Sequence, residues 1–168
     1  MQTMETVMKL GIDVGRVLIS PGDDSRPDTL FIGGTLEDAL NTPAYAGMFD
    51  VVPDLVRRFG GQVWIVSKCG QRIQDRTLQW FGHHRFFERT GIDSRNVRFC
   101  LKRPEKAIHC RELGIAHFID DRTDVLAAMD DDEAEVVSRL LSYEEATAGG
   151  MLTPEIIILP PTATVAAA

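Results

Sequence analysis

Short apolar runs that alternate with helix-like segments constrain the fold of this chain more than any other feature. Residues 7–12 and 17–19 form one nearly continuous apolar stretch, and similar runs recur as QVWIVS, NVRFCL and AHFIDD. Runs of this kind are typical of strands that are covered on both faces, as in parallel sheets. We therefore expect four parallel strands in this order along the chain.

The segments between these runs carry helix signals. Helices are predicted at residues 50–59, 70–81, 104–113 and 124–129, whereas 136–142 fits either a fifth strand or a helix end. Gly60 and Gly114 follow two of the helices, as C-terminal glycines do, and Pro104 suits a first helical turn. Strands and helices in alternation predict right-handed βαβ units. The expected fold is α/β, with a three-layer, Rossmann-like, doubly wound parallel sheet.

Chain length and local composition predict the domain organisation. The 168 residues suffice for one compact core, which we place in a single domain over residues 1–150. Residues 20–48 are rich in Gly, Pro and Asp and are expected to form an inserted loop with a hairpin around 31–35. Residues 151–168 form a tail whose last residues are expected to be disordered.

Charge and cysteine content narrow the partners and the compartment. The formal net charge is -7, so most of the surface repels nucleic acid and anionic membranes, and neither partner is indicated. The three cysteines fit neither a disulfide framework nor a zinc motif. No segment has the pattern of a signal peptide or a membrane span. The sequence predicts a cytoplasmic protein.

Polar residues end the predicted strands. Asp13 closes the first, Ser67 the second, and the pair Asp120 and Asp121 the fourth, while Lys102 and Lys106 follow the third. In a doubly wound sheet these positions converge on one crevice at the carboxyl ends of the strands. Clustered carboxylates repel one another unless a cation lies between them. Mg²⁺, a hard ion that takes oxygen ligands, suits such a cluster.

Each of these residues alone has an ordinary structural explanation. An acid after a strand often caps the next helix, a lone serine is usually a loop hydroxyl, and lysines usually lie on the surface. Only the joint arrangement favours a site.

The joint arrangement resembles the haloacid dehalogenase superfamily of phosphotransfer enzymes over residues 8–129. LGIDVGRVL is similar to the first motif of that family, VWIVSK to the second, LKRPEK to the third and HFIDDRTDVL to the fourth. The resemblance implies a haloacid dehalogenase-like (HAD-like) fold in which the insert 20–48 replaces a full cap domain. It also implies a Mg²⁺-dependent hydrolase, most simply a phosphohydrolase.

The resemblance assigns roles to named positions. Asp13 would be the nucleophile that forms an aspartyl-phosphate. Ser67 and Lys68 would contact the phosphoryl group, and Lys106, with Lys102 as the competing candidate, would balance its charge. The ligands of Mg²⁺ would be Asp13, the Gly15 carbonyl, Asp120 and Asp121.

Two positions depart from the family pattern. Gly15 stands where the phosphatases have a second aspartate that acts as general acid and base, and Arg16 stands where most members have glycine. Three explanations stay open: a phosphohydrolase without the usual acid, a hydrolase of C–P or C–halogen bonds, or a catalytically silent module that binds a phosphate-bearing ligand.

The short insert also bears on the substrate. Without a full lid the site stays open, so the phosphorylated substrate is either a macromolecule or a small molecule enclosed by a second subunit of a homo-oligomer. Tyr45, Phe49 and Phe31 either line this opening or pack under a loop. His83 and His84 are adjacent and lack further ligands, so we expect a surface turn there and no metal site.

Overall fold

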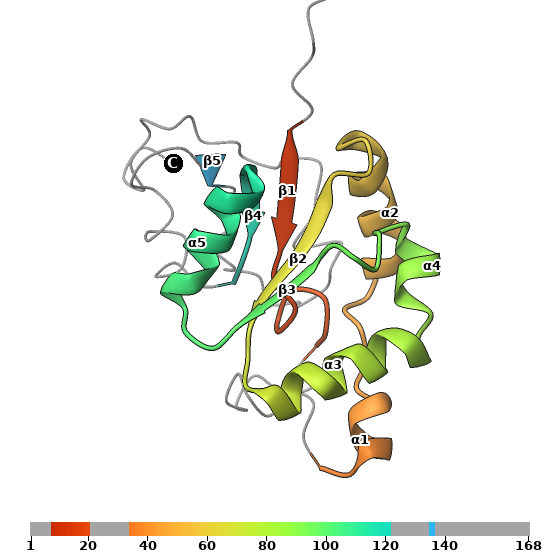
Figure 1. Cartoon of the computed structure of the whole chain (residues 1–168). Coiled ribbons are helices and arrows are strands. Elements are labelled where there is room, and N and C mark those ends of the chain that lie inside the picture. Colours follow the sequence, from red (N-terminus) through yellow and green to blue (C-terminus); the bar gives the residue numbers. More distant parts are fainter. Residues whose placement is uncertain (1–7, 21–33, 122–134, 137–168) are drawn as a thin grey trace, which may run out of the picture.

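The computed structural model describes residues 8–20, 34–121 and 135–136 and contains a parallel sheet (Figure 1). Its strands are β1 (Lys9–Ile12), β2 (Val63–Lys68), β3 (Val97–Cys100), β4 (Ile115–Ile119) and the two-residue β5 (Glu135–Val136). Their order across the sheet is β3-β2-β1-β4-β5, and every printed pairing is parallel. The predicted α/β fold with a parallel sheet is confirmed, and the arrangement is compatible with a Rossmann-like fold.

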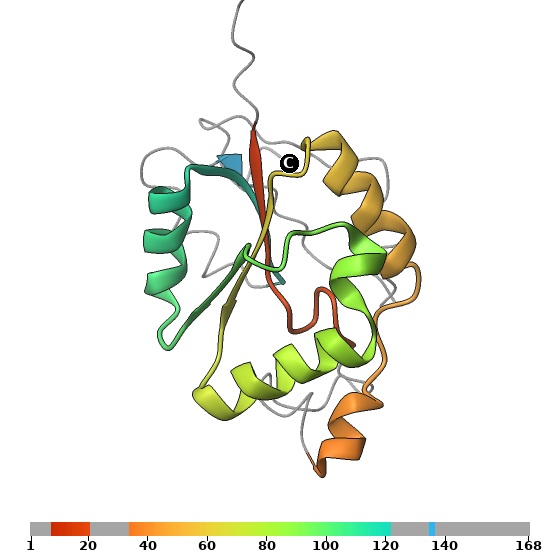
Figure 2. The same cartoon turned by 45° about the vertical axis from the view of Figure 1, so that its right-hand side comes forward.

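Helices connect the strands and cover both faces of the sheet. They are α1 (Leu36–Leu40), α2 (Met48–Arg58), α3 (Gln71–His83), α4 (Phe86–Thr90) and α5 (Pro104–Leu113). Helix α5 lies on one face, and α2, α3 and α4 lie on the other (Figure 2). Hydrophobic side chains of successive residues in β2 alternate between these faces: Val63 and Ile65 pack with the larger helical group, and Val66 packs with α5.

The face under α5 depends on one glycine. Gly11 pairs with Phe118 of β4, and a Cβ atom on Gly11 would lie 2.4 Å from the Phe118 ring. The ring therefore occupies the space that any other side chain at position 11 would need. On the opposite face, Leu10 and Ile12 of the same strand enter the larger core.

Several sequence predictions require correction. Residues 17–19 do not continue β1, because the N–H groups of Leu18 and Ile19 both donate to the Val14 carbonyl and fold the backbone into a turn. The insert 20–48 holds a helix, α1, and α2 begins within it at Met48. Thr35, assigned to a hairpin, is the N-cap of α1. The short helix α4 was not predicted.

Some predictions fall beyond the described residues. These are the helix at 124–129, the tail 151–168, residues 31–33 of the predicted hairpin and all of 136–142 except Val136. Among the described residues, no helix is both long enough and apolar enough to span a bilayer.

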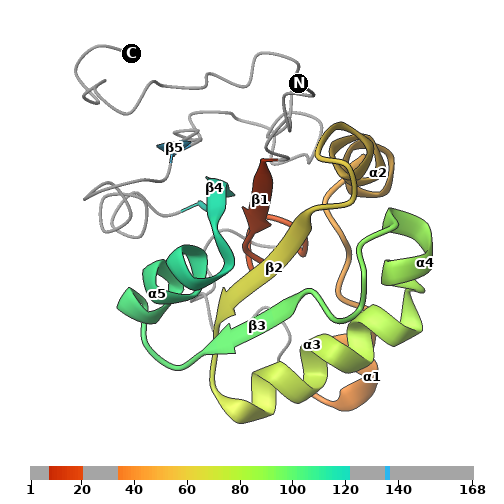
Figure 3. The ribbon, with the colours of Figure 1, turned by 45° about the horizontal axis from the view of Figure 1, so that its top comes forward.

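Strand order locates the point at which the winding of the sheet reverses. The chain moves outward from β1 to β2 and β3, and then returns past β1 to form β4. Helix α5 makes this return crossover (Figure 3). In such a sheet the direction of winding reverses between β1 and β4, and ligands bind at the carboxyl ends of the strands beside that point.

Candidate functional site

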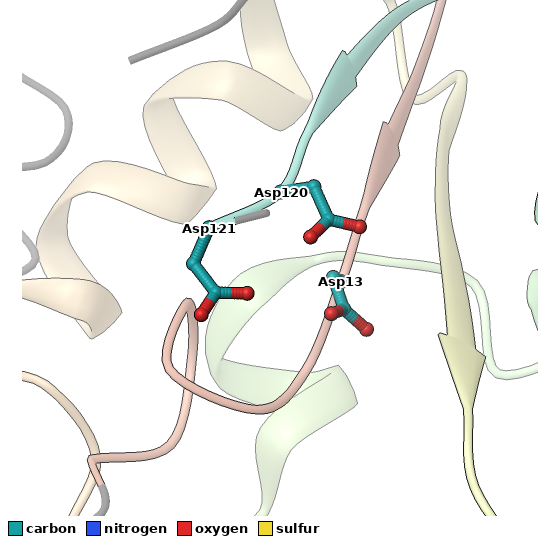
Figure 4. Close-up of side chains that lie close together, drawn as sticks. All are labelled: Asp13, Asp120 and Asp121. Carbon is teal, nitrogen blue, oxygen red and sulfur yellow. The ribbon is translucent and has the colours of Figure 1, made fainter. Parts of the chain in front are cut away.

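Three aspartates meet where the winding reverses. Asp13 follows β1, and its N–H donates to the carbonyl of Ile119, the last residue of β4, over 3.0 Å. Asp120 and Asp121 come next along the chain, so that side chains more than a hundred residues apart in sequence become neighbours (Figure 4). One carboxylate oxygen from each lies within 4.8 Å of the others. The convergence predicted at the strand ends is present for these acids.

Burial makes this proximity costly unless a cation is present. Asp13 is 7% exposed and Asp120 is 4% exposed, whereas Asp121 is half-buried. Water screens charges poorly in such a place, so two ionised carboxylates there repel each other strongly.

Lys106 supplies a cation between the two buried acids. Its Nζ lies 2.9 Å from Oδ2 of Asp13 and 2.7 Å from Oδ2 of Asp120, and the residue is only 2% exposed. Burial alone would lower the pKa of Lys106, but the charges of both aspartates and their hydrogen bonds outweigh burial and raise it. The lysine is therefore held in its charged form.

The second oxygen of Asp13 is left without a partner. Oδ1 is buried and makes no hydrogen bond in the described part of the chain. A buried carboxylate oxygen ordinarily has a donor or a cation beside it, because leaving it bare costs free energy. The Gly15 carbonyl also accepts no backbone hydrogen bond among the described residues. Both oxygens are thus available to a ligand.

These residues fit a hard divalent cation. The carboxylate oxygens of the three clustered aspartates are of the donor type that Mg²⁺ prefers. The unsatisfied Oδ1 of Asp13 is the observation in the structure that fits a cation most directly.

The loop after Asp13 carries the two departures from the family pattern. Arg16 has a φ of 58°, the left-handed region that favours glycine, and its N–H donates to the Ile19 carbonyl. A side chain there costs roughly 1–3 kcal/mol in backbone strain. The tight turn keeps this loop against the core through Val17, Leu18 and Ile19, which are all buried.

The end of β2 brings further predicted residues to the same edge. Ser67 is buried, and Lys68 is half-buried at the last position of the strand. Cys69 follows; burial first, and then the charge of Asp13, raises the pKa of its thiol to about 12. Cys69 is thus a buried, protonated thiol, as expected for a small core residue, and not an activated nucleophile.

The structure separates the two candidate lysines. Lys106 lies in the first turn of α5 and contacts both acids, whereas Lys102 precedes the helix and is exposed. Their positions after the third strand did not distinguish the two lysines, but their positions around the axis of the helix could have done so. Lys106 stands four residues before the buried Cys110, on the same inward face of the helix.

The remaining candidates have structural roles. Tyr45 is buried in the core, and Phe49 packs edge-on against Phe86 under the Arg89 guanidinium. His84 donates from Nε2 to the Leu40 carbonyl over 2.8 Å. No group of ligands forms around either His83 or His84 among the described residues. Phe31 lies outside them.

Comparison with known proteins adds no family assignment. A scan against protein-family models found no match, and a search of curated proteins found no significant match.

Proposed function

We propose that this protein is a HAD-like, Mg²⁺-dependent phosphohydrolase that uses Asp13 as its nucleophile. The observation that carries the proposal is the buried triad of Asp13, Lys106 and Asp120, in which one carboxylate oxygen of Asp13 has no partner. A protein that needed these charges only for stability would be expected to satisfy both oxygens. A buried carboxylate oxygen without a donor is open to a bound cation.

Each residue of the site has a separate role in the proposed reaction. Asp13, Asp120, Asp121 and the Gly15 carbonyl would hold Mg²⁺. When bound, the ion would neutralise the negative charge that gathers on the phosphoryl oxygens. Asp13 attacks phosphorus, the ester oxygen leaves with the bonding pair, and water then cleaves the aspartyl-phosphate to free phosphate. Lys106 holds the Asp13 carboxylate in place through Oδ2.

Gly15 determines which esters would react well. The leaving oxygen receives no proton from a side chain at position 15, so it must depart as an anion or take a proton from water. Esters whose alcohols are acidic, such as aryl phosphates, satisfy this requirement. Alkyl phosphates do not, and we expect them to react about 10²- to 10⁴-fold more slowly for want of an acid.

The proposal is tested with beryllium fluoride, which mimics a phosphoryl group on a carboxylate. Full-length protein with Mg²⁺ should give a bound fluorine signal in ¹⁹F NMR spectra, and Asp13→Asn should give none. Asp54→Asn is the matched control, because Asp54 forms exposed ion pairs with Arg57 and Arg58 on α2 and is not part of the aspartate cluster. A titration in which the wild-type protein shows no bound signal would refute the proposed function.

A second variant separates this function from its two competitors. If only the acid is missing, Gly15→Asp should raise the hydrolysis of alkyl phosphates by about 10²-fold or more. Gly15 is half-buried and stands two residues after Asp13, the position at which the phosphatases of the family have their acid. A well-folded Gly15→Asp protein that hydrolyses no phosphate ester would favour the silent phosphate-binding module. Turnover of phosphonates or halo-acids by the wild-type protein would favour a C–P or C–halogen hydrolase.

A further inference from the structure

Three basic side chains in the described part of the chain lack direct polar contacts. Within the described residues, the side chains of Lys68, Arg72 and Lys102 make no hydrogen bond or ion pair. Arg72 and Lys102 are exposed, and Lys68 is half-buried. A single unpaired surface lysine is ordinary. Three that gather at one edge of a protein with a net charge of -7 require an explanation.

The other described lysines and arginines all have contacts. Carboxylates contact Arg57, Arg58, Arg85, Arg95 and Lys106, backbone carbonyls accept from Lys9, Arg89, Arg98 and Arg111, and other interactions engage Arg16, Arg76 and Arg103. Cations elsewhere on the molecule are therefore satisfied locally, mostly by an acid or carbonyl a few residues away. The three exceptions are not spread at random over the surface.

All three lie at the carboxyl edge of β2 and β3. Lys68 is the last residue of β2 and pairs with Cys100, the last residue of β3. Lys102 follows two residues later, and Arg72 is the second residue of α3, which begins just after β2. Figure 3 shows the ends of these two strands side by side, leading into α3 and α5.

This edge adjoins the aspartate site. Ile12 pairs with Ile65, so Asp13 is level with Val66, and Lys68 lies two residues further along the neighbouring strand. That offset is about 7 Å, which a lysine side chain can span. Glu105 contributes one negative charge here: its carboxylate accepts from the N–H groups of Lys102 and Leu101, and these bonds and the charge of Lys102 lower its pKa. One acid balances only part of three positive charges.

We propose, on the basis of the function proposed above, that the substrate is a small molecule that carries a second phosphate group. Lys68, Arg72 and Lys102 bind this group while the first phosphate reacts at Asp13. An exposed guanidinium or ammonium group binds phosphate through charge-assisted hydrogen bonds. A long nucleic-acid strand fits less well, since a protein with a net charge of -7 repels a polyanion overall.

Calorimetric titration with two inorganic probes tests the assignment. In the presence of Mg²⁺, full-length protein should bind pyrophosphate about tenfold more tightly than phosphate. The triple variant Lys68→Gln, Arg72→Gln, Lys102→Gln should lose this preference, because its affinity for pyrophosphate falls about tenfold more than its affinity for phosphate. The control removes three charges elsewhere, by Arg57→Gln, Arg58→Gln and Arg95→Gln, and should keep the preference.

The outcomes are distinguishable from those of the proposed function. Equal affinity of the wild-type protein for both probes, or an equal loss in the control variant, would overturn the second phosphate site even if the beryllium fluoride adduct forms. A 5′-phosphorylated trinucleotide that binds more tightly than pyrophosphate, and weakens in the first triple variant alone, would replace the small molecule by a nucleic-acid end. If no beryllium fluoride adduct forms but the preference for pyrophosphate is retained, the second phosphate site would stand and the proposed hydrolase reaction at Asp13 would be refuted.

Discussion

At the scale of single residues, Lys106 compensates the charges of the two buried aspartates. It bonds to one oxygen of Asp13 and one of Asp120 from a position that is almost wholly enclosed. Removing one partner from a buried ion network leaves the others uncompensated, which costs more than the network itself contributes. The lysine thus has a structural role that is separable from any role in binding phosphate.

Lys106→Met should destabilise the fold by about 3–5 kcal/mol at pH 7, because two buried carboxylates then face each other without a cation. Chemical denaturation measures this loss. Adding Asp120→Asn to Lys106→Met should restore part of the stability, since the second variant removes one of the facing charges. A loss below about 1 kcal/mol would mean that water already screens the cluster.

The same network gives the stability a dependence on pH. The pKa of Lys106 is raised above its ordinary value of 10.5, so the folded protein holds this proton more tightly than the unfolded chain. The contribution of the lysine is therefore complete below pH 10.5 and disappears as the pH rises through the folded pKa. The stability difference between wild type and Lys106→Met should shrink across that range and stay constant between about pH 7 and 9.

At the scale of elements, α3 fixes the segment that carries α1. The indole Nε1 of Trp80 donates to the Thr42 carbonyl, and His84 donates to the Leu40 carbonyl, each over 2.8 Å. Trp80 is fully buried, and its ring packs against that of His84. These bonds hold the described part of the insert against the larger core.

Trp80→Phe tests this attachment. It removes the donor to a part-buried carbonyl, which costs about 1–3 kcal/mol beyond the loss of ring area. Trp64→Phe is the matched control, because the Trp64 indole nitrogen is buried without a hydrogen-bond partner in the described structure. Hydrogen exchange at residues 36–42 should accelerate in Trp80→Phe alone. Equal effects of the two variants would show that ring packing, and not the hydrogen bond, holds the segment.

Helices and strands with clear end residues or a periodic apolar pattern were predicted from the sequence. Elements that lack these features were not predicted. Helix α5 was predicted with both ends correct, since Pro104 and Gly114 mark its limits. Helices α1 and α4 have five residues each, which is too short for a periodic pattern. Residues 17–19 show the limit of apolar runs. Their burial was correctly predicted, but a turn can bury apolar residues as well as a strand can.

The candidate site could be predicted residue by residue but not as a geometry. Position at the strand ends identified Asp13, Asp120 and Asp121, since parallel strands bring their carboxyl ends to one edge. Which lysine joins them depends on the rotation of α5 about its axis, and a spacing of four residues between the candidates does not fix that rotation. The partnerless cations near Lys68 depend on which acids are close in space, information that no motif contains.

At the scale of the whole molecule, the strand order places basic and acidic side chains at neighbouring parts of one edge of the sheet. The net charge is -7, yet the edge formed by the ends of β2 and β3 carries Lys68, Arg72 and Lys102, which form no ion pair within the described residues. Beside it, the ends of β1 and β4 carry three aspartates. An ester with two phosphates and its magnesium ion would match this division, with the metal on the acidic side and the extra anion on the basic side.

Helix α5 joins two properties of the molecule that are usually independent. Among the described helices it alone covers its face of the sheet, through Ala107 and Cys110. The residue before Ala107 is Lys106, which contacts the aspartates. If thermal motion lifts this helix, the hydrophobic layer behind the sheet opens at the same moment as the acids lose their counter-ion. The charge balance of the aspartate cluster is therefore coupled to the packing of α5 on the sheet.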